Sequence, residues 1–214
     1  MAKSRSALIV MLDFTGVSLD EFNDWYDTEH IPERQRVPGF LSAQRWLSAD
    51  GKAISLAIYD LDRLDVLATA PYSAIAGDNF SPWSKRVIGS CKRMWRFEVD
   101  QISPGDQVSP EGAGGLLLFA MNVEPGAEDE FNEWYDVEHI PRLMKVPGVL
   151  AARRFRAVRG DQKYVAVYHL QAPAVVESKA WSAAVETPWT LKMRPRTSDR
   201  LRMVYAAYKR VQPA

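Results

Sequence analysis

The chain has almost no cysteine, no excess charge of either sign and no long hydrophobic run. Its 214 residues include one cysteine, Cys91, which excludes an intrachain disulfide framework and favours a reducing compartment such as the cytoplasm. The 27 basic and 27 acidic residues cancel, so no global charge favours binding to nucleic acid or to an anionic membrane. The apolar run at residues 7–12 ends at Asp13, too short for a secretion signal or a membrane span, and it predicts a first β-strand.

Short catalytic motifs are also missing. The sequence has no glycine-rich phosphate loop, no nucleophile elbow and no Cys-x-x-Cys pair. Asp27 with His30, and Asp136 with His139, have a spacing at which a helix can present two metal ligands. Two ligands are too few for a stable site, and helices on opposite sides of the expected fold could not pool them, so no metal is predicted.

What the chain does contain is an internal repeat. Residues 20–46 match residues 129–155 at a constant offset of 109, and 17 of these 27 positions are identical. Such agreement is the signature of a duplicated unit. The same offset pairs residues further along the chain, namely Tyr59 with Tyr168 and Met94 with Met203. Only the second helix region shifts, where residues 81–83 correspond to residues 187–189.

The repeat predicts two units of about 100 residues each, which is a common domain size. The segment between the two copies is rich in proline, glycine and polar residues, and we interpret it as a linker. The predicted division is a first unit at residues 1–103, a linker at 104–115 and a second unit at 116–214.

Each unit is predicted to have the order βαββαβ, which is the ferredoxin-like order. The opening strands, at residues 7–14 and 116–123, are almost continuously apolar, as in strands that are covered on both faces. The remaining strands are expected at residues 39–48, 53–61, 91–101, 148–158, 163–170 and 200–211. Two units packed face to face would cover the sheet face that a single unit leaves open.

The first helix of each unit carries the repeat. Ser18 and Glu21 have the spacing of a capping box, so the helix should begin near residue 19, whereas the second unit has Ala127 at the capping position. Pro32 disfavours helical geometry at the residue before it, so this helix should end or kink near His30.

The repeated pattern Phe-x-x-Trp-Tyr-x-x-Glu-His-x-Pro resembles the EthD-like branch of the dimeric α/β-barrel superfamily. The matching residues are Phe22, Trp25, Tyr26, Glu29, His30 and Pro32, and Phe131, Trp134, Tyr135, Glu138, His139 and Pro141. The resemblance implies an α+β fold in which two tandem ferredoxin-like units form a pseudo-dimeric barrel, with helices outside and a pocket inside. Members include cyclases, isomerases, decarboxylases, haem-binding oxygenases and proteins of unknown role, so the resemblance is more informative about fold than about reaction.

Two of the three histidines occupy this motif, at the end of a helix face that otherwise resembles core. Imidazole is the side chain most easily made an acid or a base near neutral pH. The residues three and four positions before each histidine could orient the ring or set its pKa. The predicted catalytic residues are therefore His30, Tyr26 and Asp27 in the first unit, and His139, Tyr135 and Asp136 in the second. Alternatively, a histidine beside a proline could bond a backbone carbonyl and fix the turn into the next strand.

Arg45 and Arg154 stand on the second strand of each unit. If they point into the barrel, they could hold a carboxylate, a phenolate or an enolate, because guanidinium donates two hydrogen bonds and stays charged. If they point outward, their stems cover apolar surface. The other predicted substrate-binding residues belong to the repeated motif, namely Trp25, Trp134, Asn23, Asn132, Glu29 and Glu138. Core packing is the alternative role for the tryptophans.

From the resemblance, the leading functional hypothesis is a cofactor-independent lyase or isomerase, cyclases included. It would act on a small hydrophobic carbonyl or aromatic compound by histidine-assisted proton transfer. One alternative is a small-ligand-binding or stress-associated barrel without turnover, and another is a haem-binding mono-oxygenase. The expected partner is thus a small molecule and neither nucleic acid nor membrane, and exposed edge strands would support a homodimer.

Overall fold

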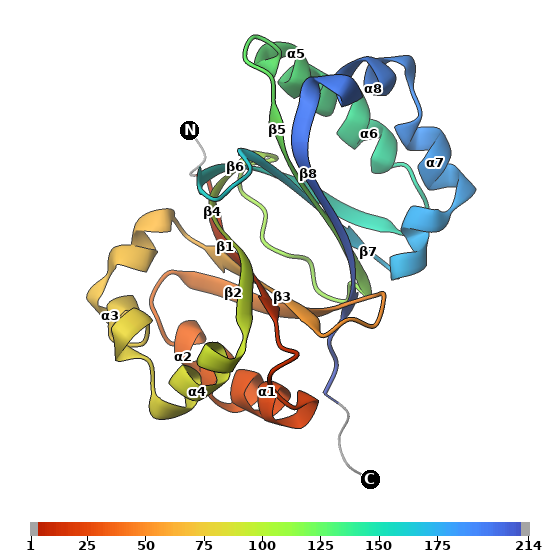
Figure 1. Cartoon of the computed structure of the whole chain (residues 1–214). Helices are drawn as coiled ribbons and strands as arrows, with labels where there is room; N and C mark the ends of the chain where they lie inside the picture. Colours follow the sequence, from red (N-terminus) through yellow and green to blue (C-terminus); the bar gives the residue numbers. More distant parts are fainter. Residues whose placement is uncertain (1–3, 211–214) are drawn as a thin grey trace.

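The strands of the protein form one closed antiparallel barrel (Figure 1). The computed structural model describes residues 4–210, apart from the side chains of Arg93 and Met94; residue 211, the end of the predicted last strand, lies outside this range. Around the barrel the strand order is β1-β3-β2-β8-β5-β7-β6-β4, so each half of the chain contributes four strands. The architecture is α+β and consistent with the predicted pseudo-dimeric barrel.

The elements follow the predicted order closely. The first half contains β1 Ser6–Asp13, α1 Leu19–Trp25, the π-helical turn η1 Tyr26–His30, α2 Ile31–Gln35, β2 Phe40–Ser48, β3 Ile54–Leu61, η2 Leu64–Ala68, α3 Ala70–Ser73, η3 Gly77–Asn79, α4 Pro82–Ser90 and β4 Lys92–Ser103. The second half contains β5 Gly115–Val123, α5 Glu128–Glu133, the π-helical turn η4 Trp134–His139, α6 Ile140–Leu143, β6 Val149–Arg159, β7 Tyr164–Leu170, η5 Pro173–Glu177, α7 Lys179–Val185, α8 Pro188–Met193, η6 Arg194–Arg196 and β8 Thr197–Ala207.

Two junctions close the barrel between the halves. β2 pairs with β8 and β4 pairs with β6, both antiparallel. The helices of the two halves lie on opposite outer sides of the barrel (Figure 1). Because each of the eight strands is paired on both sides, a homodimer through edge strands has no free edge to use, and a homodimer through another surface stays a prediction.

The barrel interior is a packed hydrophobic core. Alternate residues of the strands fill it, among them Ile9, Met11, Leu56, Ile58, Phe97, Leu118, Phe155, Val167 and Tyr205. The opposite faces of the same strands pack against the helices of their own half. β1 and β5 are therefore covered on both faces, as their continuous apolar runs predicted.

The helix carrying the motif begins where predicted, and its regular α-helical part gives way to a π turn that ends at His30. The Ser18 hydroxyl accepts the Glu21 backbone N–H at 3.3 Å, whereas Ala127 provides no side-chain cap. Beyond α1 and α5 the chain widens into a π turn and then continues as α2 or α6, with the motif proline in its first turn. In η1 the N–H of Ile31 reaches back five residues to the carbonyl of Tyr26.

The physical reason is that a π turn accommodates proline better than an α turn does. Proline lacks an N–H, and its ring collides with the carbonyl four residues earlier in an ordinary α-helix. The wider turn relieves both problems and places an extra residue in the helix, which is a common arrangement at functional sites. Within residues 4–210, no helix combines the length and the apolar character needed to cross a membrane.

Candidate functional site

Each half has a cavity between its helices and the outer face of its sheet, and the repeated motif lines both cavities. The cavity of the second half has a volume of about 400 Å³ and includes Trp134, His139 and Tyr168 in its lining. The corresponding cavity of the first half has about 50 Å³ and is lined by Trp25, Tyr26 and His30, among others. The motif therefore faces space outside the barrel wall, whereas the resemblance implied a pocket inside the barrel, where apolar side chains are packed instead.

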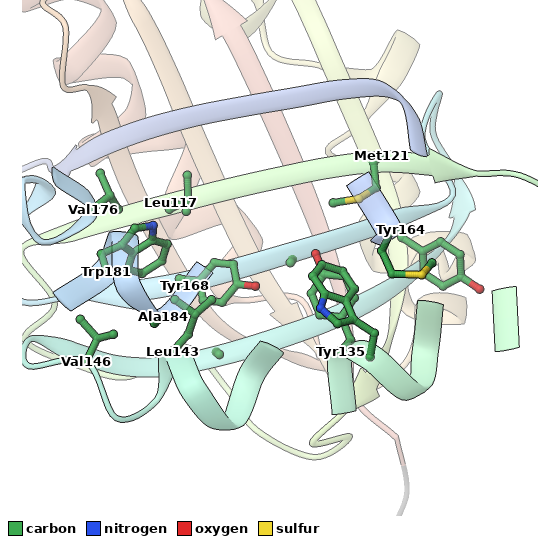
Figure 2. Packing of buried hydrophobic residues seen from close by; sticks show 14 of the residues in the cluster. Leu117, Met121, Tyr135, Leu143, Val146, Tyr164, Tyr168, Val176, Trp181 and Ala184 are labelled. Carbon is green, nitrogen blue, oxygen red and sulfur yellow. The ribbon is translucent and has the colours of Figure 1, made fainter. Parts of the chain in front are cut away.

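The second cavity has an apolar interior and a charged mouth. Leu117, Phe119, Met121, Val176, Trp181 and Met193 form most of the interior. Figure 2 shows Leu117, Val176 and Trp181 grouped at one end of this region and Met121 with Tyr164 at the other, with Tyr168 and Tyr135 between them. The charged residues of the lining are Glu186, Arg194, Arg200 and Arg202, all exposed. This arrangement suits a small hydrophobic molecule.

His139 is held in the wall of the cavity by aromatic side chains. Its ring centroid lies 4.4 Å from that of Trp134 and 5.1 Å from that of Tyr135, which meets it edge-on. Its Nδ1 is buried and has no hydrogen-bond partner among the described residues. Burial, reinforced by the nearby Arg154 cation, lowers the pKa of His139 to about 3, so the imidazole is neutral at physiological pH.

Tyr168 is a site residue that the sequence analysis did not select. Its side chain lines the cavity, and its buried hydroxyl interacts with the hydroxyl of Tyr135. Burial raises the pKa of Tyr168 well above 10 and that of the adjoining Tyr135 to about 12, so both phenols stay protonated. The sequence did offer an indication of this position, because Tyr168 matches Tyr59 at the repeat offset of 109.

The predicted arginine, aspartate and asparagine residues come together, but they do not reach the histidine. Arg154 donates to Asp136 Oδ1 at 3.2 Å and to Asn132 Oδ1 at 2.7 Å, and its guanidinium lies 4.0 Å from the Tyr135 ring centroid. In the first half the same contacts join Arg45 to Asp27 at 3.1 Å and to Asn23 at 2.8 Å.

Both arginines therefore point outward from the barrel and tie the motif helix to the second strand. Because Asp27 and Asp136 are engaged by the arginines, they accept no hydrogen bond from His30 or His139 in the described residues. Tyr26 and Tyr135 contact the imidazoles edge-on, with ring centroids 5.0 Å and 5.1 Å apart. Among the described residues, no group of three or more His, Cys, Asp or Glu side chains is arranged to hold a metal ion.

Glu29 binds the start of α4, and Glu138 binds the start of α8. Glu29 Oε1 accepts from the hydroxyls of Ser81 at 2.6 Å and Ser84 at 2.8 Å. Glu138 Oε1 accepts from Thr187 at 2.6 Å. These contacts place the two glutamates in helix-to-helix packing.

The two motif tryptophans differ in their hydrogen bonding. Trp25 Nε1 donates to Ser84 Oγ at 2.9 Å. Trp134 Nε1 is buried without a partner in the part of the chain that the structure describes. The second half is thus the one whose motif tryptophan keeps an unused donor.

The small first cavity is lined by a buried arginine. Arg34, which is 3% exposed, donates to the carbonyls of His30 at 3.3 Å and Ile75 at 3.2 Å, and its guanidinium lies 5.7 Å from the Phe80 ring centroid. At the offset of 109 the second half has Leu143 in place of Arg34, and Leu143 is packed in the core and does not line the second cavity.

The arginines at the mouth were missed because they lie outside the repeated motif. Val10 and Phe119 are equivalent at the repeat offset of 109. In the sheet Val10 is opposite Arg96 and Phe119 is opposite Arg202, so Arg96 and Arg202 are equivalent and the last strands correspond at an offset of 106. The predicted equivalence of Met94 and Met203, at 109, is therefore wrong. The shift of three residues already present at 81–83 and 187–189 persists through the last strand.

Comparison with known proteins supports the fold and nothing finer. No family model matches the chain, and no curated protein matches it. An anthrone oxidase-like protein is similar in structure, with 14% identity, coverage of 97% of this chain and 92% of that chain, and a TM-score of 0.66. A putative monooxygenase from Fusobacterium nucleatum has 12% identity, coverage of 98% and 94%, and a TM-score of 0.64. A haem-binding protein from Thermus thermophilus has 14% identity, coverage of 96% and 92%, and a TM-score of 0.61.

These relatives have the dimeric α/β-barrel fold, and so does this chain. Placement in the EthD-like branch stays a prediction.

Proposed function

We propose that the cavity of the second half binds a small hydrophobic carbonyl or aromatic compound and that His139 assists a proton transfer on it, as in a cofactor-independent lyase or isomerase. The observation that carries this proposal is the difference between two copies of one motif. His139 lines a cavity of about 400 Å³, within the range of small-molecule sites, whereas His30 lines one of about 50 Å³.

The site favours a neutral imidazole that accepts a proton from an acidic C–H or O–H group. At neutral pH His139 is entirely in its base form, and its low pKa makes it a weak base in the empty cavity. The anion left on the substrate would raise the proton affinity of the adjacent imidazole. The protonated Tyr168 hydroxyl would donate a hydrogen bond to the substrate oxygen on which the charge develops. Returning the proton to a different substrate atom completes an isomerisation.

Anthrone is a suitable probe because it is a tricyclic ketone with an acidic methylene group, and one structural relative is described as anthrone oxidase-like. We expect the protein to accelerate exchange of the methylene protons with deuterated solvent, followed by proton NMR under anaerobic conditions. His139→Ala should lose about 100-fold or more of this acceleration, which is the range for general-base catalysis. His30→Ala, the matched control, should retain it.

The pH profile separates this mechanism from one that uses an ordinary histidine. Because the pKa of His139 is about 3, the base form is still complete at pH 5, and the exchange rate should not fall between pH 7 and pH 5 on account of this group. Equal rates in wild type and His139→Ala, with both proteins folded, would refute the catalytic role.

A non-catalytic ligand-binding barrel is the second candidate, and it uses the same cavity. It is favoured if a neutral aromatic probe binds in the cavity while none of a panel of enolisable ketones shows faster proton exchange with the solvent.

A haem-binding mono-oxygenase is the third candidate, because a neutral imidazole is the form that binds iron and one structurally similar protein is a haem-binding protein. Addition of haem should then produce a Soret band that His139→Ala shifts or abolishes.

A further inference from the structure

We propose that the ligand of the second cavity carries an anionic group, such as a carboxylate or sulfonate, and that Arg202 binds this group at the mouth. The inference rests on the proposed function, because it presupposes that the cavity holds a small hydrophobic molecule. It adds the chemical class of that molecule, namely an aromatic or alicyclic acid.

Arg202 occupies the position where the apolar interior meets polar surface. It lies on β8 opposite Phe119 of β5, and both side chains line the cavity. Arg202 also borders an adjoining groove of about 620 Å³, lined in part by Ser48, Asp50 and Lys52 of the turn between β2 and β3. A ligand seated in the apolar interior would therefore place a polar end beside Arg202.

The three arginines at the mouth differ in what they already bind. Arg194 pairs with Glu186 at 2.7 Å, and Arg200 donates to the Thr197 hydroxyl at 2.7 Å. The Arg202 side chain, by contrast, makes no hydrogen bond and no ion pair with any residue in the range 4–210. Its guanidinium is always charged and presents a planar fork that matches a carboxylate.

The first half shows what such an arginine binds when the chain supplies the anion. Arg96, the counterpart of Arg202 in the sheet, donates to Glu98 Oε1 from Nε at 3.0 Å and pairs with the same oxygen through Nη2 at 2.9 Å. Two residues after Arg202, where Glu98 would correspond, the chain has Val204. The second half therefore keeps the cation and the open cavity but has no carboxylate at this position of the strand. Asp50, which lines the adjoining groove, pairs with Lys52, so the Arg202 guanidinium is available to an anionic group of the ligand.

The test uses two fluorescent probes that share an aromatic body and differ in charge. Anilinonaphthalene sulfonate carries a sulfonate, and phenylnaphthylamine is its neutral analogue. We expect both to bind, and Arg202→Gln to weaken the sulfonate probe by about tenfold or more while changing the affinity of the neutral probe by less than about twofold. Val204→Glu, which copies Glu98, should weaken only the sulfonate probe because it supplies an internal partner for Arg202.

A blocking variant locates the binding. Glu186→Phe copies Phe80, which lines the closed first cavity, and should exclude both probes. Loss of Glu186 also frees the Arg194 cation, which would strengthen anion binding, so weaker binding can only reflect the closed cavity.

The outcomes separate the two proposals. If both probes bind and Glu186→Phe excludes them, but Arg202→Gln and Val204→Glu leave the ratio of their affinities unchanged, the anion inference is overturned and the cavity proposal stands. If neither probe binds, or if Glu186→Phe has no effect, the cavity proposal fails and the anion inference fails with it.

Discussion

At the scale of single residues, His30, His139 and His169 are all buried, and burial lowers the pKa of each imidazole below its ordinary value of 6.5. Cations reinforce the effect, namely Arg34 and Arg45 near His30, Arg154 near His139 and Arg153 near His169. His169 lies inside the barrel with both ring nitrogens buried and without partners among the described residues, and its pKa falls to about 3. All three side chains are therefore neutral in the folded protein.

The neutral histidines predict a loss of stability in mild acid. Each unfolded histidine binds a proton below about pH 6.5, while its folded counterpart does not, so the stability they contribute is complete above that pH and declines as pH falls toward the folded pKa. The slope should be about 1.4 kcal/mol per pH unit for each histidine. Urea unfolding between pH 7.5 and pH 5 measures it.

His139→Gln should reduce this slope by about 1.4 kcal/mol per pH unit, because unfolding of the variant takes up one proton fewer. The pKa of the Asp60 carboxyl is lowered, so this buried group binds its proton only below this window. An unchanged slope in His139→Gln would show that the imidazole is protonated in the folded protein.

At the scale of secondary structure, the π turn decides where the motif side chains point. The 3.6-residue periodicity grouped Leu19, Phe22, Tyr26 and His30 on one face. The last three are buried, whereas Leu19, in the first turn, is 52% exposed. The extra residue in the turn then lets the helix pass the proline and continue as α2 to Gln35. The predicted end or kink of the regular helix near His30 takes the form of this π turn. The proline in the sequence indicates the interruption, but it does not show that packing leaves space for a wider turn.

The two copies of this helix should respond differently to changes at the capping position. Ser18→Ala should cost about 1 kcal/mol of unfolding free energy, because Ser18 has extended backbone geometry and its hydroxyl accepts the Glu21 N–H. Ala127→Ser should bring no matching gain. Ala127 has φ of −100° and ψ of −4°, which is helical geometry, and it is fully buried. Chemical denaturation checks both, and a gain of about 1 kcal/mol for Ala127→Ser would contradict this account of the cap.

At the scale of the whole molecule, a buried polar cluster joins the two halves through the segment between β4 and β5. Arg153 on β6 pairs with Asp60 on β3 at 2.6 Å, and the two side chains are 0% and 1% exposed. The segment between β4 and β5 contributes Ser109, whose N–H donates to Asp60 Oδ2 at 2.7 Å and whose hydroxyl accepts from Arg153 at 2.7 Å. Burial acts to raise the pKa of Asp60, but the Arg153 cation and these hydrogen bonds lower it overall.

Breaking this pair should be costly, whereas replacing it should not be. Arg153→Met leaves the Asp60 carboxylate buried without its cation and should cost about 3–5 kcal/mol of unfolding free energy. The double variant Asp60→Leu with Arg153→Met should recover most of that loss, because two apolar side chains need no partner. Both are measured by urea unfolding at pH 7.5. A double variant no more stable than Arg153→Met would show that Asp60 remains well solvated or otherwise paired.

The sequence by itself determined the repeat, the strand order of each half and the double-sided burial of β1 and β5, because these follow from local periodicity and from the match between the two copies. Only the tertiary structure decided that Arg45 and Arg154 face the helices, since alternation along a strand separates its two faces without saying which one is inside. It also decided which half is open. The difference between Arg34 and Leu143 does not by itself indicate which half has the larger cavity. The volume of each cavity depends on side chains from distant elements that meet only in the folded chain.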